Sequence, residues 1–306
     1  MILTLEPDRR VDLDAVVADL IDAGELARAL IITPTKRKAR ALRRELAERT
    51  AIEAANVETL GGLAERLALA EFVEYELADE TAVVSLLRAR IDNDNIRLLE
   101  TFRSGAREGA LIGMAAAIEE YARHGVESER LREAARTLEP ARKRNALDFA
   151  DLYADFRRAL EEARLLLTGD CVAKLNALSR ELFEARLAES YPDANLALVF
   201  GYTAFAAPEV DFLARIAKTR GRRLYLRFDY RAFNRPLFGA LEETHKTLTE
   251  RGFREAKDVS PASAAAFENA LRERLFARGE PTSRFADRAT VLVARDEREE
   301  VESIVS

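Results

Sequence analysis

Apolar residues in the N-terminal part of the chain form short runs that alternate with stretches of helical spacing. Residues 2–5 predict a short strand, and the apolar positions of residues 11–21 recur at helical spacing. Residues 29–33 form an unbroken apolar run that ends at Pro34, and residues 36–49 again have one apolar face. Two strand-loop-helix segments this close together predict a βαβ unit and therefore a parallel sheet.

The middle of the chain predicts helices alone. A short segment at residues 56–62 leads into a helix over about 63–77, and helical periodicity continues to about Tyr191. Within this block we expect helices near residues 80–91, 95–103, 108–124, 127–137 and 146–164, with stops at Gly125 and Pro140. Such a block between strand segments predicts a helical subdomain inserted into an α/β domain.

Strand patterns return after Pro192. The expected elements are a strand at 195–201, a helix at 208–219, a strand at 222–229, helices near 240–251 and 263–276, a strand at 290–294 and a helical start at 297–305. Because a strand followed by barely two helical turns is an odd ending, we expect the 306 residues to be a fragment of a longer protein.

Composition places the chain among intracellular proteins with a large core. It is 48% apolar and 33% charged, and no stretch reaches the roughly 20 apolar residues that span a bilayer. Cys171 is the only cysteine, which excludes a disulfide framework and favours a cytoplasmic location without membrane contact. The formal charge of −6 argues against a basic surface over the whole protein but leaves room for a local basic patch.

The sequence lacks a phosphate-binding loop. Such a loop needs glycines and a lysine that reaches the phosphates, and none of the 13 glycines precedes a lysine. The corresponding segment, residues 6–14, is rich in acidic residues, and its Arg9 and Arg10 are more typical of a solvated loop than of an anion site. We therefore expect no ATP hydrolysis and no bound cofactor.

The histidines do not predict a catalytic or metal site. His124 and His245 are far apart, and neither has the spacing of a zinc motif. His124 precedes Gly125 at an expected helix end, where an imidazole can interact with the helix dipole, and His245 is typical of an exposed helical position. We predict no catalytic residue and no metal ligand.

A basic cluster does stand out where a buried strand meets the start of a helix. Its hydroxyls and cations are those of Thr33, Thr35, Lys36, Arg37, Lys38 and Arg40. Hydroxyls, free N–H groups at a helix start and cations are the groups that contact a nucleic-acid backbone. A solvated first turn of helix is the alternative, although cations at a helix N-terminus oppose the helix dipole.

The order of several segments resembles superfamily 1 helicases. Residues 31–46 look like motif Ia, which in that family touches single-stranded DNA, and residues 57–67 look like the next motif, with Thr59 at its backbone-contacting position. Asp148-Phe-Ala-Asp-Leu152 is similar to the D-F-x-D-L signature that precedes the Walker B strand.

The resemblance is closer to the degenerate motor halves of AddB-like and RecC-like subunits of bacterial helicase-nucleases. Where the active helicases carry D-E-x-Q, this chain has Gly201, Tyr202, Thr203 and Ala204, as in the G-[FY]-x-x-[FL] pattern of AddB-like subunits. Residues 291–304 resemble the A-x-x-x-x-x-E-V-x-x-I segment that opens their later half. Loss of both nucleotide motifs together is typical of a motor that no longer hydrolyses ATP.

The resemblance implies a RecA-like, 1A-like parallel sheet domain made of residues 1–75 and 165–306, with an all-helical, 1B-like insertion at 76–164. The implied function is scaffolding and guiding of single-stranded or unwinding DNA in double-strand-break repair, beside a partner helicase subunit. Catalysis would belong to a PD-(D/E)XK exonuclease region beyond this fragment or to a partner motor.

Two other functions stay open from the sequence. The chain can be a docking scaffold for a partner helicase that binds no DNA itself. It can also be a nucleotide-dependent enzyme with an unconventional phosphate site at Arg9 and Arg10, a hypothesis that the missing glycines and lysine disfavour.

Overall fold

The computed structural model describes residues 3–6, 13–49, 56–93, 107–228, 230 and 235–255. Residues 1–229 and 243–258 belong to one compact unit. A second unit, residues 230–242 and 259–306, contributes the short helix α12 (Arg235–Phe238) and the 3-10 turn η3 (Gly239–Leu241) to the described part. The elements expected at 95–103, 263–276, 290–294 and 297–305, and the loop with Arg9 and Arg10, lie outside the described residues.

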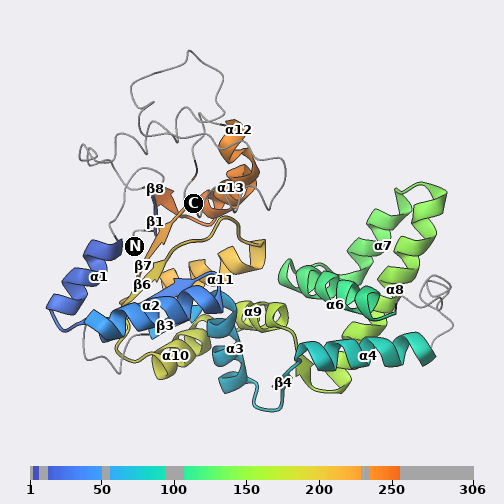
Figure 1. Ribbon diagram of the computed structural model, residues 1–306, viewed down its shortest axis with the longest axis horizontal. Helices are drawn as coiled ribbons and strands as arrows, with labels where there is room; N and C mark the ends of the chain where they lie inside the picture. The colour runs from blue at the N-terminus through green and yellow to red at the C-terminus, as the bar shows by residue number, and fades with distance from the viewer. Residues whose placement is uncertain are drawn as a thin grey trace, which may run out of the picture. The chain divides into compact units, whose positions relative to one another are not determined.

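A parallel sheet organises the first unit (Figure 1). Its strands are β1 (Leu3–Glu6), β2 (Ala29–Thr33), β3 (Asn56–Thr59), β6 (Leu196–Val199), β7 (Arg223–Arg227) and β8 (Arg254–Glu255). They lie in the order β3-β2-β6-β7-β1-β8, and every neighbouring pair is parallel. The predicted α/β class with a parallel sheet is confirmed.

The first two strands are not neighbours in this sheet. Strands β6 and β7, which come more than 160 residues later than β2, lie between β1 and β2. A local pattern identifies strands but not their order, so the predicted βαβ unit joins two parallel strands that are not adjacent in the sheet.

The direction of the crossovers decides which face each helix covers. The connections through α1 (Leu13–Asp22) and α2 (Lys36–Arg49) run toward the β3 edge, whereas the connection through α11 (Ala207–Lys218) runs the other way. Because such crossovers are right-handed, α11 lies on the face opposite α1 and α2. Val17, Ile31 and Leu46 belong to one buried cluster on the α1 and α2 face.

Strand β2 and helix α2 have the bounds that the sequence predicts. Every residue of β2 is buried, as expected for a central parallel strand covered on both faces. Pro34 ends the strand, and Thr35 caps the helix, because its hydroxyl accepts a hydrogen bond from the Lys38 N–H at 3.1 Å.

Four helices between β3 and β6 pack around a core of their own (Figure 1). They are α4 (Glu80–Asn93), α6 (Arg107–Arg123), α7 (Ser128–Arg136) and α8 (Pro140–Glu162). Their buried cluster includes Leu87, Ile118 and Phe156. The helix before Pro140 ends at Arg136, as expected, and Pro140 is itself the first residue of α8, a position that needs no N–H donor.

The described part of the chain contains further elements. They are the 3-10 turn η1 (Leu26–Arg28), α3 (Leu60–Glu71), α9 (Thr168–Ala177), α10 (Arg180–Ser190), α13 (Glu242–Glu250), and the strands β4 (Glu76–Leu77) and β5 (Leu165–Leu166). Strands β4 and β5 form a two-stranded parallel pair just before α4 and just after α8. No helix in the described part of the chain is long and apolar enough to cross a membrane.

Candidate functional site

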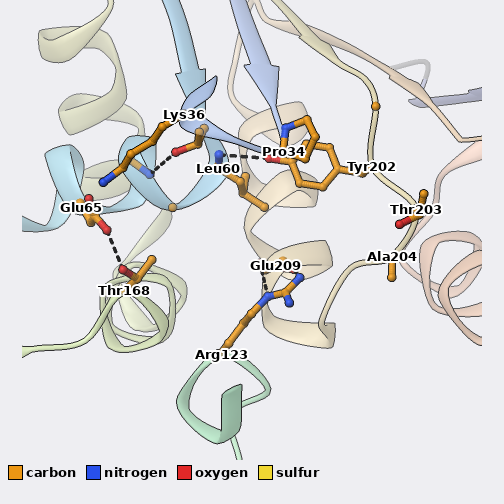
Figure 2. A pocket seen from close by; sticks show the side chains of 14 residues that line it. Pro34, Lys36, Leu60, Glu65, Arg123, Thr168, Tyr202, Thr203, Ala204 and Glu209 are labelled. Atoms are coloured by element: carbon orange, nitrogen blue, oxygen red, sulfur yellow. Dashed lines mark hydrogen bonds and ion pairs between the residues drawn. The ribbon is translucent and has the colours of Figure 1, made fainter. Parts of the chain in front are cut away.

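A cavity of about 530 Å³ opens at the carboxyl edge of the sheet (Figure 2). Strands β2 and β6 lie side by side there, and their following connections diverge in opposite directions. In open parallel sheets such a divergence leaves a crevice in which ligands bind. The residues that line the cavity are Pro34, Lys36, Thr59, Leu60, Gly61, Gly62, Glu65, Arg123, Thr168, Gly201, Tyr202, Thr203, Ala204 and Glu209.

The start of α2 supplies the positive charge beside this cavity. Lys36 lines the cavity, and the side chains of Lys36, Arg37, Lys38 and Arg40 are exposed. Within the described residues these four cations form no ion pair, whereas the nearby Arg43 and Arg66 both reach Glu58. The α2 N-terminus therefore presents to an external anion a group of cations that have no ion-pair partner among the described residues.

Thr33 differs from the other predicted contact residues because it is buried. Only 1% of its surface is exposed, and its hydroxyl lies 3.4 Å from the Thr35 carbonyl and 3.5 Å from the Glu58 carbonyl. Its side chain thus links the ends of β2 and β3 inside the protein, so it is not a surface contact in this structure.

The start of α3 forms a second wall of the cavity. The Thr59 hydroxyl accepts a hydrogen bond from the Gly62 N–H at 3.0 Å and so caps the helix. Gly61 leaves no room for a side chain, since a Cβ there would lie 2.8 Å from the Thr168 methyl carbon. The predicted contact residue Thr59 is therefore a helix cap at the cavity wall, with its hydroxyl already engaged.

The segment after β6, which aligns with the D-E-x-Q motif of the active helicases, lines another side of the cavity. Gly201 has a φ of +81°, and a Cβ there would lie 3.2 Å from the Lys38 Nζ. Tyr202 follows, with its ring stacked on Phe205 at a centroid distance of 4.6 Å. Thr203 and Ala204 are exposed and complete the lining, so the four predicted positions of this segment all lie at the cavity.

Two carboxylates of the lining are already engaged. Glu65 accepts a hydrogen bond from the Thr168 hydroxyl at 2.6 Å. Glu209 accepts two bonds from Arg123, at 2.9 and 3.0 Å, and one from the Ala206 N–H at 2.8 Å (Figure 2). The bond to Glu209 is the main cause that raises the pKa of Arg123. The negative charge of Glu209 is thus balanced within the protein.

A smaller cavity of about 360 Å³ adjoins the first and shares Gly61, Arg123, Thr168 and Glu209 with it. Glu119 of α6 lines this second cavity, and burial, then the charges of Asp170 and Glu65, raise its pKa to about 7. Asp170 is paired with Arg157 at 2.5 Å, and Arg157 lowers the pKa of Glu119 in part. A half-buried acid that titrates near neutrality therefore lies where α6 meets α3 and α9.

The remaining reactive side chains do not form a site in the described part of the chain. His124 contacts Glu120 at 2.9 Å on an exposed face, and Cys171 is buried, which raises the pKa of its thiol to about 12. Among the described residues, no group of three or more His, Cys, Asp or Glu side chains is arranged to hold a metal ion.

The chain matches no protein-family model and no curated protein.

Sequence reasoning missed Arg123 and Glu209 as parts of this site. They lie 86 residues apart, so no local pattern relates them. The segment Ala206-Ala-Pro-Glu209 did carry a readable signal, because Pro in the first turn and Glu at its third position are typical of a helix start. That signal predicts the cap on Ala206 but not the partner arginine.

Proposed function

We propose that this protein binds the backbone of single-stranded DNA along the carboxyl edge of its sheet. The observation that carries the proposal is the group of exposed cations at the start of α2, Lys36, Arg37, Lys38 and Arg40, beside a cavity of about 530 Å³. The chain as a whole is acidic, with a formal charge of −6, so this local excess of positive charge is not a general property of its surface.

The chemistry of the edge suits a row of phosphates. Cations at the start of α2 attract the phosphate charge, and binding releases the counterions that the nucleic acid holds. At the start of α3, the N–H groups of Leu60 and Gly62 are taken by Tyr202 and Thr59. The described residues provide no internal acceptor for the Gly61 N–H, which leaves it as a donor at the cavity wall.

We infer a RecA-like, 1A-like arrangement for the sheet. Strands β1 and β6, which precede the two segments where nucleotide motifs are lost, belong to one parallel sheet with β7 between them, and this supports the inference. The helices α4, α6, α7 and α8, which share one core, correspond to a 1B-like insertion at residues 76–164. The pair of β4 and β5 lies at the two ends of that range, which supports these bounds.

In this proposal the module guides DNA without hydrolysing ATP. The sequence has no Gly-Lys step of a phosphate loop, and Gly201 and Tyr202 lie where the active helicases carry the two acids of D-E-x-Q. The resemblance to AddB-like subunits implies a role in cytoplasmic double-strand-break repair, beside a partner helicase, with nuclease chemistry outside this module.

The test is a fluorescence-anisotropy titration of the protein with a short single-stranded oligonucleotide at about 50 mM and about 200 mM salt. We expect binding at the lower concentration that weakens steeply at the higher one. No binding at low salt would contradict the proposal and favour the alternative, a docking scaffold for a partner helicase.

A further inference from the structure

The hydroxyl of Tyr202 joins two segments that are far apart in the sequence. It donates a hydrogen bond to the Thr33 carbonyl at 2.7 Å and accepts one from the Leu60 N–H at 3.2 Å. Figure 2 shows the Tyr202 ring beside Pro34, with its hydroxyl directed at Leu60. One side chain therefore contacts both the end of β2 and the start of α3.

Two aromatic side chains hold the Tyr202 ring in position. Tyr202 stacks on Phe205 with an interplanar angle of 22°, and Phe205 contacts the buried Phe228 at a centroid distance of 6.3 Å. Burial raises the pKa of Tyr202, so its hydroxyl stays protonated and keeps its donor role at neutral pH. The phenol therefore links the two segments through a side chain that is held in one orientation.

The two bonded groups lie close to the two helix starts of the cavity, one shortly before α2 and one at the first residue of α3. Thr33 is two residues before the cap of α2 and three before Lys36, and Leu60 is the first residue of α3. The hydroxyl of Tyr202 thus adds a link between the two helix starts, beside the pairing of β2 with β3 that ends at Thr33 and Thr59.

We propose that Tyr202 is a positioning residue that holds the starts of α2 and α3 at the separation needed to contact neighbouring phosphates of one strand. This inference rests on the proposed function. Tyr202 touches the binding groups and not the DNA, so it acts on affinity through geometry and contributes no charge.

The test compares Tyr202→Phe with the wild type and with two control variants in single-stranded DNA titrations over a range of salt. Tyr202→Phe keeps the ring and its stacking but loses both hydrogen bonds. Tyr225→Phe removes a hydroxyl that has no hydrogen-bond partner among the described residues, and Lys36→Ala removes one cation.

We expect Tyr202→Phe to weaken binding by about threefold to tenfold, the effect of one or two lost hydrogen bonds. The slope of log affinity against log salt stays unchanged, because no cation is removed, whereas Lys36→Ala reduces that slope. Tyr225→Phe binds as the wild type does.

Two outcomes overturn the inference and differ from a failure of the proposed function. One is wild-type affinity in Tyr202→Phe, with or without a loss of thermal stability, which would show a purely structural role. The other is a reduced salt slope in Tyr202→Phe, which would show loss of a phosphate contact. If the wild type itself binds no DNA, the proposed function fails and the positioning role fails with it.

Discussion

Arg123 of α6 holds Glu209 of α11 through two parallel hydrogen bonds, from Nε to Oε1 at 2.9 Å and from Nη2 to Oε2 at 3.0 Å. The pair joins the helical block to a helix of the sheet at the wall of the cavity. Two-bonded arginine–carboxylate pairs fix orientation as well as distance. This contact therefore helps set how the helical block is placed against the cavity.

Replacing Arg123 with alanine is expected to lower the free energy of unfolding by about 1–2 kcal/mol. Glu209 has only 13% of its side chain exposed and loses its charged partner, while the 40% exposure of Arg123 limits the loss through solvent screening. Urea unfolding measures the change. Arg130→Ala on α7, an exposed arginine, is the control and stays within about 0.5 kcal/mol of the wild type. Equal effects of the two variants would contradict a structural role for the pair.

Gly169 marks a second close contact between the same blocks. A Cβ at this position would lie 2.4 Å from the Ala122 carbonyl carbon and 2.5 Å from the Arg123 nitrogen, so the α6 backbone has to move. We expect Gly169→Ala to destabilise the protein by about 1–3 kcal/mol. Gly113→Ala is the matched control, because nothing lies within 4 Å of its Cβ position and it should stabilise α6 by roughly 0.5–1 kcal/mol. Thermal or urea unfolding of both variants tests whether their changes in stability have opposite signs.

Glu119 makes stability depend on pH. Its pKa is raised from 4.5 to about 7 in the folded protein, so between these values the folded state binds more protons than the unfolded state. The contribution of Glu119 is therefore favourable below the unfolded pKa and is lost as pH rises through about 7. Glu119→Gln removes this dependence, because the amide does not ionise.

The measurement is the urea midpoint at about pH 5 and about pH 8 for the wild type and Glu119→Gln. Other titrating groups act in both proteins. The change in urea midpoint between the two pH values in the wild type, minus the same change in Glu119→Gln, therefore isolates Glu119. We expect the wild type to lose more stability than the variant on going to the higher pH. Parallel changes would show that Glu119 has the same pKa in both states.

The sequence predicted the parts of the fold that have strong local patterns. Strand β2 and helix α2 were placed at their observed bounds, because an unbroken apolar run, Pro34 and an N-terminal cap on Thr35 act within a few residues. Strands β4 and β5 were missed, since two residues each have no readable periodicity. The order of the strands also escaped prediction, because it depends on pairings between distant segments.

The candidate site also has parts that the sequence predicted and parts that it did not. The cluster at the start of α2 was predicted because its residues are consecutive, but the burial of Thr33 was not, since burial depends on β3. The sequence analysis placed Tyr202 in a family pattern and in a lost magnesium-binding motif, but it predicted no structural role for the side chain. Its role in joining two segments follows from partners 142 and 169 residues away, which no sequence window contains.

The most direct test of the central claim is the affinity for single-stranded DNA of a variant with Lys36, Arg37 and Lys38 changed to alanine. A second variant, with Arg142, Lys143 and Arg144 of α8 changed to alanine, loses the same charge from another helix and serves as the control. Both are titrated with one oligonucleotide at about 50 mM salt. The account predicts that the first variant loses most of its affinity while the control binds as the wild type does. Equal affinities in the two variants would contradict it.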